Sequence, residues 1–174
     1  MNARSNRAYV ALGANLGSAV QNIESALGQL KQWSLLPVRS SSFWESSPVD
    51  CPPGSPLFAN AVAELCPDPN SSPEQLLESL LAVERAAGRS NRRELNSPRP
   101  LDLDLIAYGR ETRNTARLIL PHPRAHLRRF VLLPLAELNP DLVLPGQRLS
   151  VSELLADLKT NEALRRIRGP LPME

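Results

Sequence analysis

Residues 98–106 read Pro98-Arg99-Pro100-Leu101-Asp102-Leu103-Asp104-Leu105-Ile106, a stretch that would be an ordinary buried strand without its two carboxylates. With the two-residue period of a strand, Asp102 and Asp104 point to the same side, with Cα atoms about 6.5–7 Å apart. Buried carboxylates need counter-charge, which arginines or a metal ion can supply. A half-exposed edge strand with a solvated polar face is the plain alternative. Arg99 and the apolar run after Asp104 favour the charged site.

Arginines gather around this stretch. Lys31 and Lys159 are the only lysines, and eleven arginines fall between Arg85 and Arg129. A guanidinium group grips phosphate oxygens with a rigid two-pronged fork. A local excess of arginine beside two metal-type carboxylates therefore predicts a polyphosphate ligand. Codon bias would explain the choice of arginine over lysine, but it would not explain the clustering.

The composition is that of an ordinary globular protein, with 22% charged and 42% hydrophobic residues. We expect one domain over residues 1–174. No apolar run approaches the roughly 18–20 residues of a membrane span, and no secretory signal is visible, so we expect a cytoplasmic protein with no membrane partner. A net charge of +2 does not call for nucleic acid. Cys51 and Cys66 are expected to be free thiols.

The hydrophobic pattern predicts alternating strands and helices. Strands are expected over 7–12, 37–45, 57–66 and from the aspartates to about 108, and helices over 18–33, 72–87, 130–138 and 150–158. Ser18 with Gln21, and Ser72 with Gln75, each have the spacing of a capping box. The glycines of 13–17 are expected to form a turn. The basic tail beyond about residue 159 is expected to be poorly ordered.

The resulting order is β-α-β-β-α-β. We therefore predict an α+β fold, a ferredoxin-like antiparallel sheet with two helices on one face and appended C-terminal helices. Glu84 falls on the buried stripe of the second helix, and Gly88 is expected to end that helix in the left-handed conformation. The polar segment 89–100 has the length of a functional loop.

Several motifs together resemble a known family. They are Gly13-Ala-Asn-Leu-Gly17, Phe58-Ala-Asn60, Glu84 with Gly88-Arg89, Pro98-Arg99-x-x-Asp102-Leu-Asp104, and Pro121-His122-Pro-Arg124 leading to Arg128 and Phe130. In order and spacing they are similar to the 6-hydroxymethyl-7,8-dihydropterin pyrophosphokinases of folate biosynthesis, over roughly residues 8 to 145. The aspartate motif with its preceding Pro-Arg is the specific part.

The resemblance implies a reaction in which ATP gives its β,γ-diphosphate to the hydroxymethyl oxygen of the pterin and AMP is released. Asp102 and Asp104 would hold two Mg²⁺ ions, which can neutralise entering and leaving oxygens together. Arg89 and Arg99 would close over the triphosphate as further catalytic residues. The remaining ATP-binding residues implied by the resemblance are Glu84, Arg92, Arg117, His122 and Arg128. We expect a monomer whose partners are these small molecules.

The same resemblance implies a pterin pocket, because a flat ring system needs two apolar faces and hydrogen bonds along its edge. Its implied residues are Ser46, Ser47, Val49, Phe58, Asn60 and Phe130. From the residues alone, core packing is the plainer expectation for both phenylalanines. A neighbouring loop is likewise the plainer hydrogen-bond partner for Asn60.

The chain departs from the family in segment 88–99, where Leu95, Asn96 and Ser97 stand in place of a basic residue followed by Trp-Gly. This departure motivates the alternative of a non-catalytic pterin- or nucleotide-binding relative. An RNA-binding module would need an aromatic and basic strand that is absent here. An Asp-x-Asp nucleotidyl- or glycosyltransferase would not need Phe58, Asn60 and Phe130. His122 and His126 have a spacing that suits zinc, but Pro123 disfavours the helix this would require.

Overall fold

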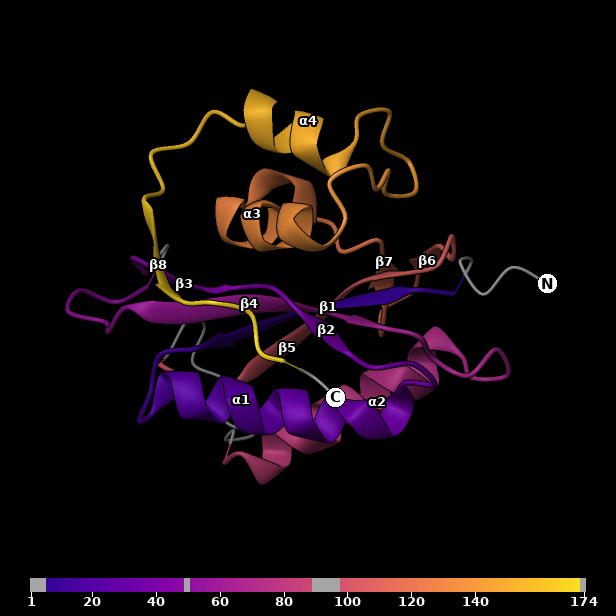
Figure 1. Ribbon diagram of the computed structural model, residues 1–174, viewed down its shortest axis with the longest axis horizontal. Helices are drawn as coiled ribbons and strands as arrows, with labels where there is room; N and C mark the ends of the chain where they lie inside the picture. Colours follow the sequence, from indigo (N-terminus) through magenta and orange to yellow (C-terminus); the bar gives the residue numbers. More distant parts are fainter. Residues whose placement is uncertain (1–5, 49–50, 89–97, 173–174) are drawn as a thin grey trace.

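The computed structural model describes residues 6–48, 51–88 and 98–172. Its main sheet has the strand order β5-β1-β4-β3-β8, with every neighbouring pair antiparallel (Figure 1). The strands are β1 (Ala8–Ala14), β3 (Phe43–Ser46), β4 (Phe58–Leu65), β5 (Asp102–Tyr108) and β8 (Leu164–Arg168). The short β2 (Arg39–Ser40) also pairs with β4, while β6 (Arg113–Asn114) and β7 (Ile119–Leu120) form a separate pair. The four strands β5-β1-β4-β3 have the predicted ferredoxin-like arrangement.

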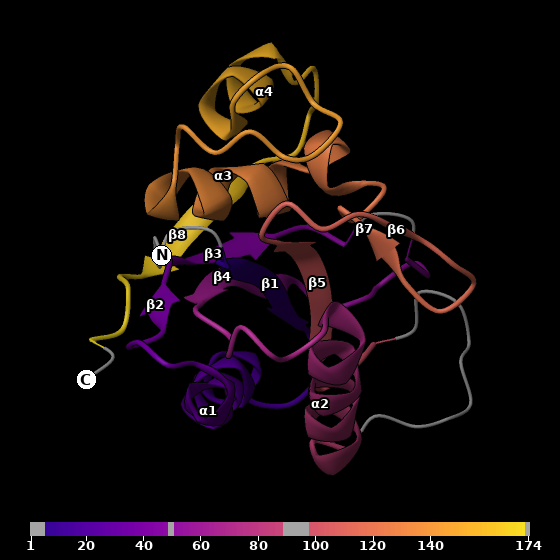
Figure 2. The same ribbon diagram turned by 90° about the vertical axis from the view of Figure 1, so that its right-hand side faces the viewer.

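One face of the sheet is covered by α1 (Ala19–Leu30) and α2 (Pro73–Ala86), which lie beneath it in Figures 1 and 2. A short 3₁₀ turn, Lys31–Trp33, extends α1. The buried side of α1 consists of Ile23, Ala26, Leu27 and Leu30. These side chains pack in one core with every second residue of β4, from Ala59 to Leu65. The period-two pattern of β4 and the helical period of α1 therefore meet at this face.

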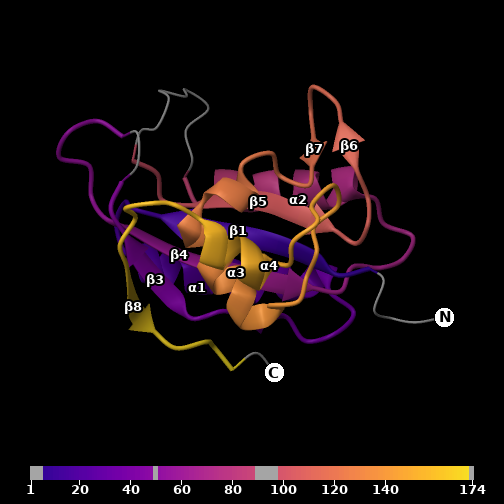
Figure 3. The same cartoon turned by 90° about the horizontal axis from the view of Figure 1, so that it is seen from above.

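The opposite face is covered by the appended helices α3 (Arg129–Leu138) and α4 (Val151–Asp157), which lie across the sheet in Figure 3. Val62, on the other side of β4, packs in this second core with Leu132 and Leu135 of α3. A 3₁₀ turn, Ala125–Leu127, precedes α3. The sheet is thus the middle layer of three. None of the helices that the structure describes has the length and apolarity needed to cross a membrane.

The second helix has the predicted ends. In α2 the Ser72 side chain accepts the backbone N–H of Gln75, and the Gln75 side chain accepts that of Ser72. Gly88 follows the helix with a φ of 91°, the left-handed conformation that glycine adopts without a steric penalty.

Three expectations are wrong in detail. Ser18 precedes α1 but makes no side-chain capping hydrogen bond, so no capping box exists there. The strand expected over 37–45 is divided into β2 and β3, and between them the Ser41 hydroxyl donates to the Ser42 carbonyl and accepts the backbone N–H of Val62 in β4. Gly13 belongs to β1 rather than to the turn that follows it.

Part of the tail beyond residue 159, which was expected to be poorly ordered, forms a strand. Residues 164–168 form β8, which pairs with β3 at the edge of the sheet. Arg165 forms an ion pair with Glu45 of β3 at 2.7 Å, and Ile167 packs against the first core. Arginines in this strand hid its period-two pattern, because their charged groups reach solvent or a carboxylate while the strand remains paired.

Candidate active site

The two aspartates lie on β5 and face the same side, as predicted. Asp102 and Asp104 are half-buried and line the same cavities, whereas Leu103 and Leu105 between and after them are buried. The edge-strand alternative describes part of the geometry as well. β5 is the terminal strand of the main sheet, and the Asp102 side chain is 25% exposed. These carboxylates face a cavity lined with arginines rather than open solvent.

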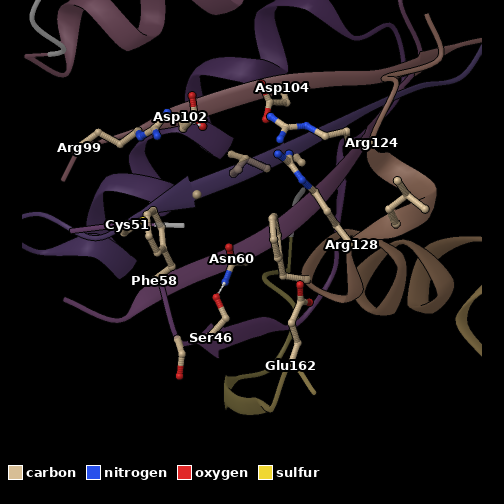
Figure 4. Close-up of a pocket in the computed structure, with 16 residues that line it drawn as sticks. Ser46, Cys51, Phe58, Asn60, Arg99, Asp102, Asp104, Arg124, Arg128 and Glu162 are labelled. Carbon is tan, nitrogen blue, oxygen red and sulfur yellow. Dashed lines mark hydrogen bonds and ion pairs between the residues drawn. The ribbon is translucent and has the colours of Figure 1, made fainter. Parts of the chain in front are cut away.

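Two adjoining cavities meet at this strand. The first has a volume of about 310 Å³ and the second about 510 Å³. Five residues line both cavities, and we call them the shared rim: Arg99, Asp102, Asp104, Arg124 and Arg128. Figure 4 shows Arg99 beside Asp102, and Arg124 extending toward Asp104 from the other end of the rim. The site thus consists of two compartments, and the boundary between them carries both carboxylates and guanidinium groups.

The residues predicted from the sequence divide between the two cavities. The first cavity is lined by the predicted pterin residues Ser46, Ser47, Phe58, Asn60 and Phe130. The second is lined by the predicted nucleotide residues Glu84, Arg117 and His122, and Arg128 belongs to the rim. Val49, Arg89 and Arg92, together with the unusual Leu95, Asn96 and Ser97, lie outside the described residues. Their predicted roles stay predictions.

Arg99 is held in place by Asp102 of β5 and by Asn15, which follows β1. Its guanidinium Nη1 lies 3.1 Å from the Asp102 Oδ2 atom. Its backbone N–H donates to the Asn15 Oδ1 atom at 2.9 Å, and its carbonyl accepts the Asn15 backbone N–H at 3.2 Å. Asn15 therefore fixes the chain just before β5 by matching both hydrogen-bonding groups of one residue.

Glu84 supports the aspartate strand from below. Its side chain is buried, and Oε1 accepts the backbone N–H of Leu103 at 2.6 Å. Leu103 lies between the two aspartates, so this hydrogen bond to a side chain of α2 fixes the middle of the motif. Arg117, by contrast, is 61% exposed and forms an ion pair with Glu78 of α2. Both residues line the second cavity, and their contact with ATP remains a prediction.

The first cavity has an amide at its base. The Asn60 Nδ2 atom donates to the Trp44 carbonyl at 3.2 Å and to the Ser46 Oγ atom at 2.8 Å. These bonds to β3 orient the amide, and Figure 4 shows its oxygen pointing away from Ser46. Phe58 and Phe130 are half-buried and line the cavity from different elements. The arrangement offers two aromatic surfaces and an oriented hydrogen-bond acceptor.

Charge shapes the second cavity. Burial, together with the positive charges of Arg128 and Arg124, lowers the pKa of His122 to about 4, against the smaller opposing effect of Asp102. Burial and Arg124 also lower the pKa of Arg128, while the nearby carboxylates of Asp104, Asp102 and Glu162 raise it. His122 is therefore a neutral imidazole at pH 7, beside a concentrated positive charge.

The carboxylates suit magnesium. Within the part of the chain that the structure describes, His122 and His126 do not belong to any group of three or more His, Cys, Asp or Glu side chains that could hold a metal ion. Mg²⁺ is commonly held by one or two carboxylates together with waters and substrate phosphates. Asp102 and Asp104, on one side of one strand and next to arginines, fit that donor set.

Among the polar and charged residues of the site, Arg124, Cys51 and Glu162 were not predicted from the sequence. Arg124 belongs to a quoted motif, so its position near the arginine cluster was an available signal. Cys51 and Glu162 line the first cavity but had no such signal. Cys51 comes from an irregular loop, and Glu162 comes from the tail that was expected to be poorly ordered.

Comparison with known proteins identifies the family. A family model described as 7,8-dihydro-6-hydroxymethylpterin-pyrophosphokinase (HPPK) matches residues 9–140. The chain belongs to this family. The HPPK match runs from Tyr9 in β1 to just beyond α3 and includes every residue of the shared rim.

Curated proteins agree with this assignment. A 2-amino-4-hydroxy-6-hydroxymethyldihydropteridine pyrophosphokinase of Haemophilus influenzae is 37% identical over 91% of this chain and 96% of its own length. Its counterpart from Pseudomonas aeruginosa is 42% identical over 86% of this chain and 90% of its own length. These relatives support membership of the HPPK family along most of the sequence.

Solved structures agree in fold. A crystal structure of an HPPK-DHPS in complex with substrates superposes with a TM-score of 0.69, at 12% identity over 87% of this chain. Wild-type Plasmodium falciparum HPPK-DHPS with SDX-DHP gives a TM-score of 0.70 at 13% identity, again over 87% of this chain. The chain spans 43% and 44% of these two longer chains. At this identity the comparison establishes the HPPK fold.

Proposed function

We propose that the chain is the pyrophosphokinase for which its relatives are named, and that the paired cavities are its active site. In this reaction the hydroxymethyl oxygen of the pterin bonds to the β-phosphorus of ATP. The bond between the β-phosphorus and the oxygen bridging it to the α-phosphate breaks, AMP leaves, and the hydroxyl proton is released. The observation that carries the proposal is the division of the site into two cavities that share a rim of two carboxylates and three arginines.

The first cavity would take the pterin. Phe58 and Phe130 supply apolar surfaces for a flat ring, and the Asn60 oxygen accepts a hydrogen bond from its edge. Ser46 and Ser47 form the wall near Asn60. Because the cavity opens onto the shared rim, a ring bound here can direct its hydroxymethyl group toward Asp102 and Asp104.

The second cavity and the rim would take ATP. Arg99, Arg124 and Arg128 bring three positive charges to the position expected for the triphosphate, where phosphoryl transfer needs positioning and charge neutralisation. Neutral His122 can exchange hydrogen bonds with phosphate or ribose without adding charge. Asp102 and Asp104 would hold Mg²⁺. A metal ion held by these two carboxylates would neutralise charge on the phosphate oxygens.

Two magnesium ions, a monomeric state and a cytoplasmic location belong to the same proposal. The donor set of two carboxylates supports magnesium, and the small-molecule substrates need no second chain. Membership of the family supports catalysis over the non-catalytic binding alternative. No observation on the described residues favours that alternative. The unusual segment that motivated this alternative lies among residues 89–97, outside the described residues.

The test is release of AMP from ATP in the presence of Mg²⁺ and 6-hydroxymethyl-7,8-dihydropterin. We expect turnover by the wild-type chain, and a loss of about 100-fold or more in Asp102→Asn and Asp104→Asn, because each variant removes one carboxylate from the charge-neutralising site. Melting temperatures should stay near the wild-type value, since each change also removes a partly buried negative charge.

Asp157→Asn is the matched control, because Asp157 is an exposed carboxylate at the end of α4. It should keep full activity. A wild-type chain that binds the pterin but forms no AMP would contradict catalysis. Normal turnover in either rim variant would contradict the metal role alone.

A further inference from the structure

The segment that connects α4 to β8 brings one carboxylate to the first cavity. Glu162 is half-buried and lines this cavity but not the second. It lies beyond residues 9–140, the part of the chain that the family model matches. Figure 4 shows it below the cavity, on the side opposite to Asp102 and Asp104. This part of the pocket wall therefore comes from a different region of the sequence than the aspartate motif.

Glu162 contacts the beginning of α3. Its Oε2 atom accepts the backbone N–H of Arg129, the first residue of the helix, at 3.0 Å. The N–H groups of a first helical turn have no partner within the helix, and a negative charge there is favourable. Arg128, at the N-cap position, provides no side-chain cap. Glu162, which lies 33 positions after Arg129 in the sequence, thus supplies the capping hydrogen bond.

The turn that Glu162 holds carries two residues of the site. Arg128 comes directly before Arg129, and Phe130 directly after it. The guanidinium carbon of Arg128 lies 5.4 Å from the centre of the Phe130 ring, within the range of a cation–π contact. The negative charge of Glu162 also stabilises the charged form of Arg128, whereas the positive charge of Arg124 destabilises it. A shift of this turn would move an aromatic wall and a rim arginine together.

Glu162 is itself held from both sides. Its backbone N–H donates to the Thr160 Oγ1 atom at 3.2 Å. Two residues later the chain enters β8, where Leu164 pairs with Ser46, another residue of the cavity wall. The Arg165–Glu45 ion pair and the packing of Ile167 fix this strand on β3. The carboxylate therefore has a defined position relative to both β3 and α3.

We propose that Glu162 is a positioning residue of the ring site: its carboxylate holds the first turn of α3 so that Phe130 and Arg128 face the cavity. This inference rests on the proposed function, which assigns the first cavity to the pterin. Glu162 acts through Arg129 N–H and needs no contact with the substrate. Through Glu162, the C-terminal segment between α4 and β8 would contribute to pterin affinity.

The experiment compares Glu162→Ala, Glu162→Gln and the control Asp157→Asn in the full-length chain. Pterin and a non-hydrolysable ATP analogue are titrated separately by calorimetry. We expect Glu162→Ala to bind the pterin roughly three- to tenfold more weakly, the size of effect that follows from losing one capping interaction. Glu162→Gln should stay within about twofold of wild type, because its amide oxygen still accepts the Arg129 N–H. Asp157→Asn should match wild type.

Amide hydrogen exchange at Arg129 gives a second measurement that does not depend on any substrate. Exchange should be faster in Glu162→Ala and close to wild type in Glu162→Gln, since only the alanine variant lacks an acceptor. Affinity for the ATP analogue should fall less than affinity for the pterin in Glu162→Ala, because Glu162 does not line the second cavity.

Three outcomes would overturn the proposal: unchanged pterin affinity in Glu162→Ala, no recovery in Glu162→Gln, or equal losses of both ligands together with a lower melting temperature. The wild-type chain separates this inference from the proposed function. If the wild type neither binds the pterin nor forms AMP, the function itself is wrong. If the wild type is active while Glu162→Ala binds normally, the positioning role alone is wrong.

Discussion

At the scale of single residues, Gly13 lies in the floor of the first cavity. It belongs to β1, where it is paired with Asn60 on one side and with Asp102 on the other. Its φ is not among the left-handed values of the chain, and a Cβ atom there would lie 3.8 Å from the Asn60 Oδ1 atom, an ordinary contact. The backbone can thus accept a side chain, but the space above it belongs to the cavity.

We therefore expect Gly13→Val to fold and to lose the ring ligand. Valine suits a strand, and its branched side chain would occupy cavity volume next to Asn60. Pterin affinity measured by calorimetry should fall by about tenfold or more, which corresponds to roughly 1.4 kcal/mol. Gly28→Ala, at an exposed position of α1 with open space around it, should keep full affinity and gain about 1 kcal/mol in stability. Unchanged pterin binding in Gly13→Val would place the ring elsewhere.

His122 should titrate far below the usual range. Burial and the charges of Arg128 and Arg124 keep its pKa at about 4, against 6.5 for an unperturbed imidazole. The unfolded chain therefore takes up a proton as the pH falls below about 6.5, whereas the folded chain resists it until about 4. The contribution of neutral His122 to stability is thus present above pH 6.5 and lost as the pH falls through about 4.

NMR titration of the ligand-free chain can measure this pKa directly. Arg128→Ala should raise it toward 6.5, because the change removes a nearby positive charge and admits water. Arg110→Ala, in the exposed turn after β5, should leave it unchanged. A wild-type midpoint near 6.5 would contradict the burial and charge of the second cavity.

At the scale of elements, the two serines that precede helices test the importance of capping. Ser72 forms a complete capping box with Gln75, whereas Ser18 makes no side-chain cap. Ser72→Ala should lower the free energy of unfolding by about 1 kcal/mol, and Ser18→Ala by much less. Urea unfolding of the two variants measures the difference. Equal losses would mean that the Ser18 side chain does cap α1 in solution.

The aspartate strand and the helices were predictable because their periodicity reports burial. Leu103 and Leu105 alternate with Asp102 and Asp104, and β5 begins at Asp102, as the pattern indicates. Ser18 has the same spacing to Gln21 as Ser72 has to Gln75, yet only one pair bonds. Spacing shows which contacts are geometrically possible, but side-chain rotamers and the direction of the incoming chain decide which ones form.

At the scale of the whole molecule, the two cores share the same sheet. Alternate residues of β4 enter the first core with α1 and α2, while Val62 enters the second with α3. Loss of either core would expose one face of every central strand. The three layers should therefore unfold as one cooperative unit, as single domains of this size usually do.

The two tryptophans provide probes for this prediction. Trp33 packs against the first core, and the Trp44 Nε1 atom donates to Glu137 of α3 on the other face. Fluorescence of Trp33→Phe and Trp44→Phe variants, each retaining one tryptophan, should follow the same urea transition as far-UV circular dichroism. Transitions that are separated in urea concentration would show that the appended helices unfold on their own.

The parts of the site that escaped prediction depend on contacts between distant segments. Asp102, Asp104 and Arg99 lie in one motif, so local pattern was sufficient to join them. Glu162 meets Arg129 only because β8 returns to β3, and nothing near Glu162 in the sequence indicates that return. Long-range pairing of a short, arginine-rich strand leaves a weak local signal.

The pairing of β8 with β3 also has a consequence for biosynthesis. β3 leaves the ribosome more than a hundred residues before its partner β8. Until β8 has been synthesised, the backbone N–H and C=O groups on this edge of the nascent sheet remain unpaired. Domains acquire their structure largely in the order of translation, and an unpaired edge is a place where chains associate wrongly. A chain that ends prematurely after α4 would therefore be prone to aggregation, and would not simply be a shorter form of the enzyme.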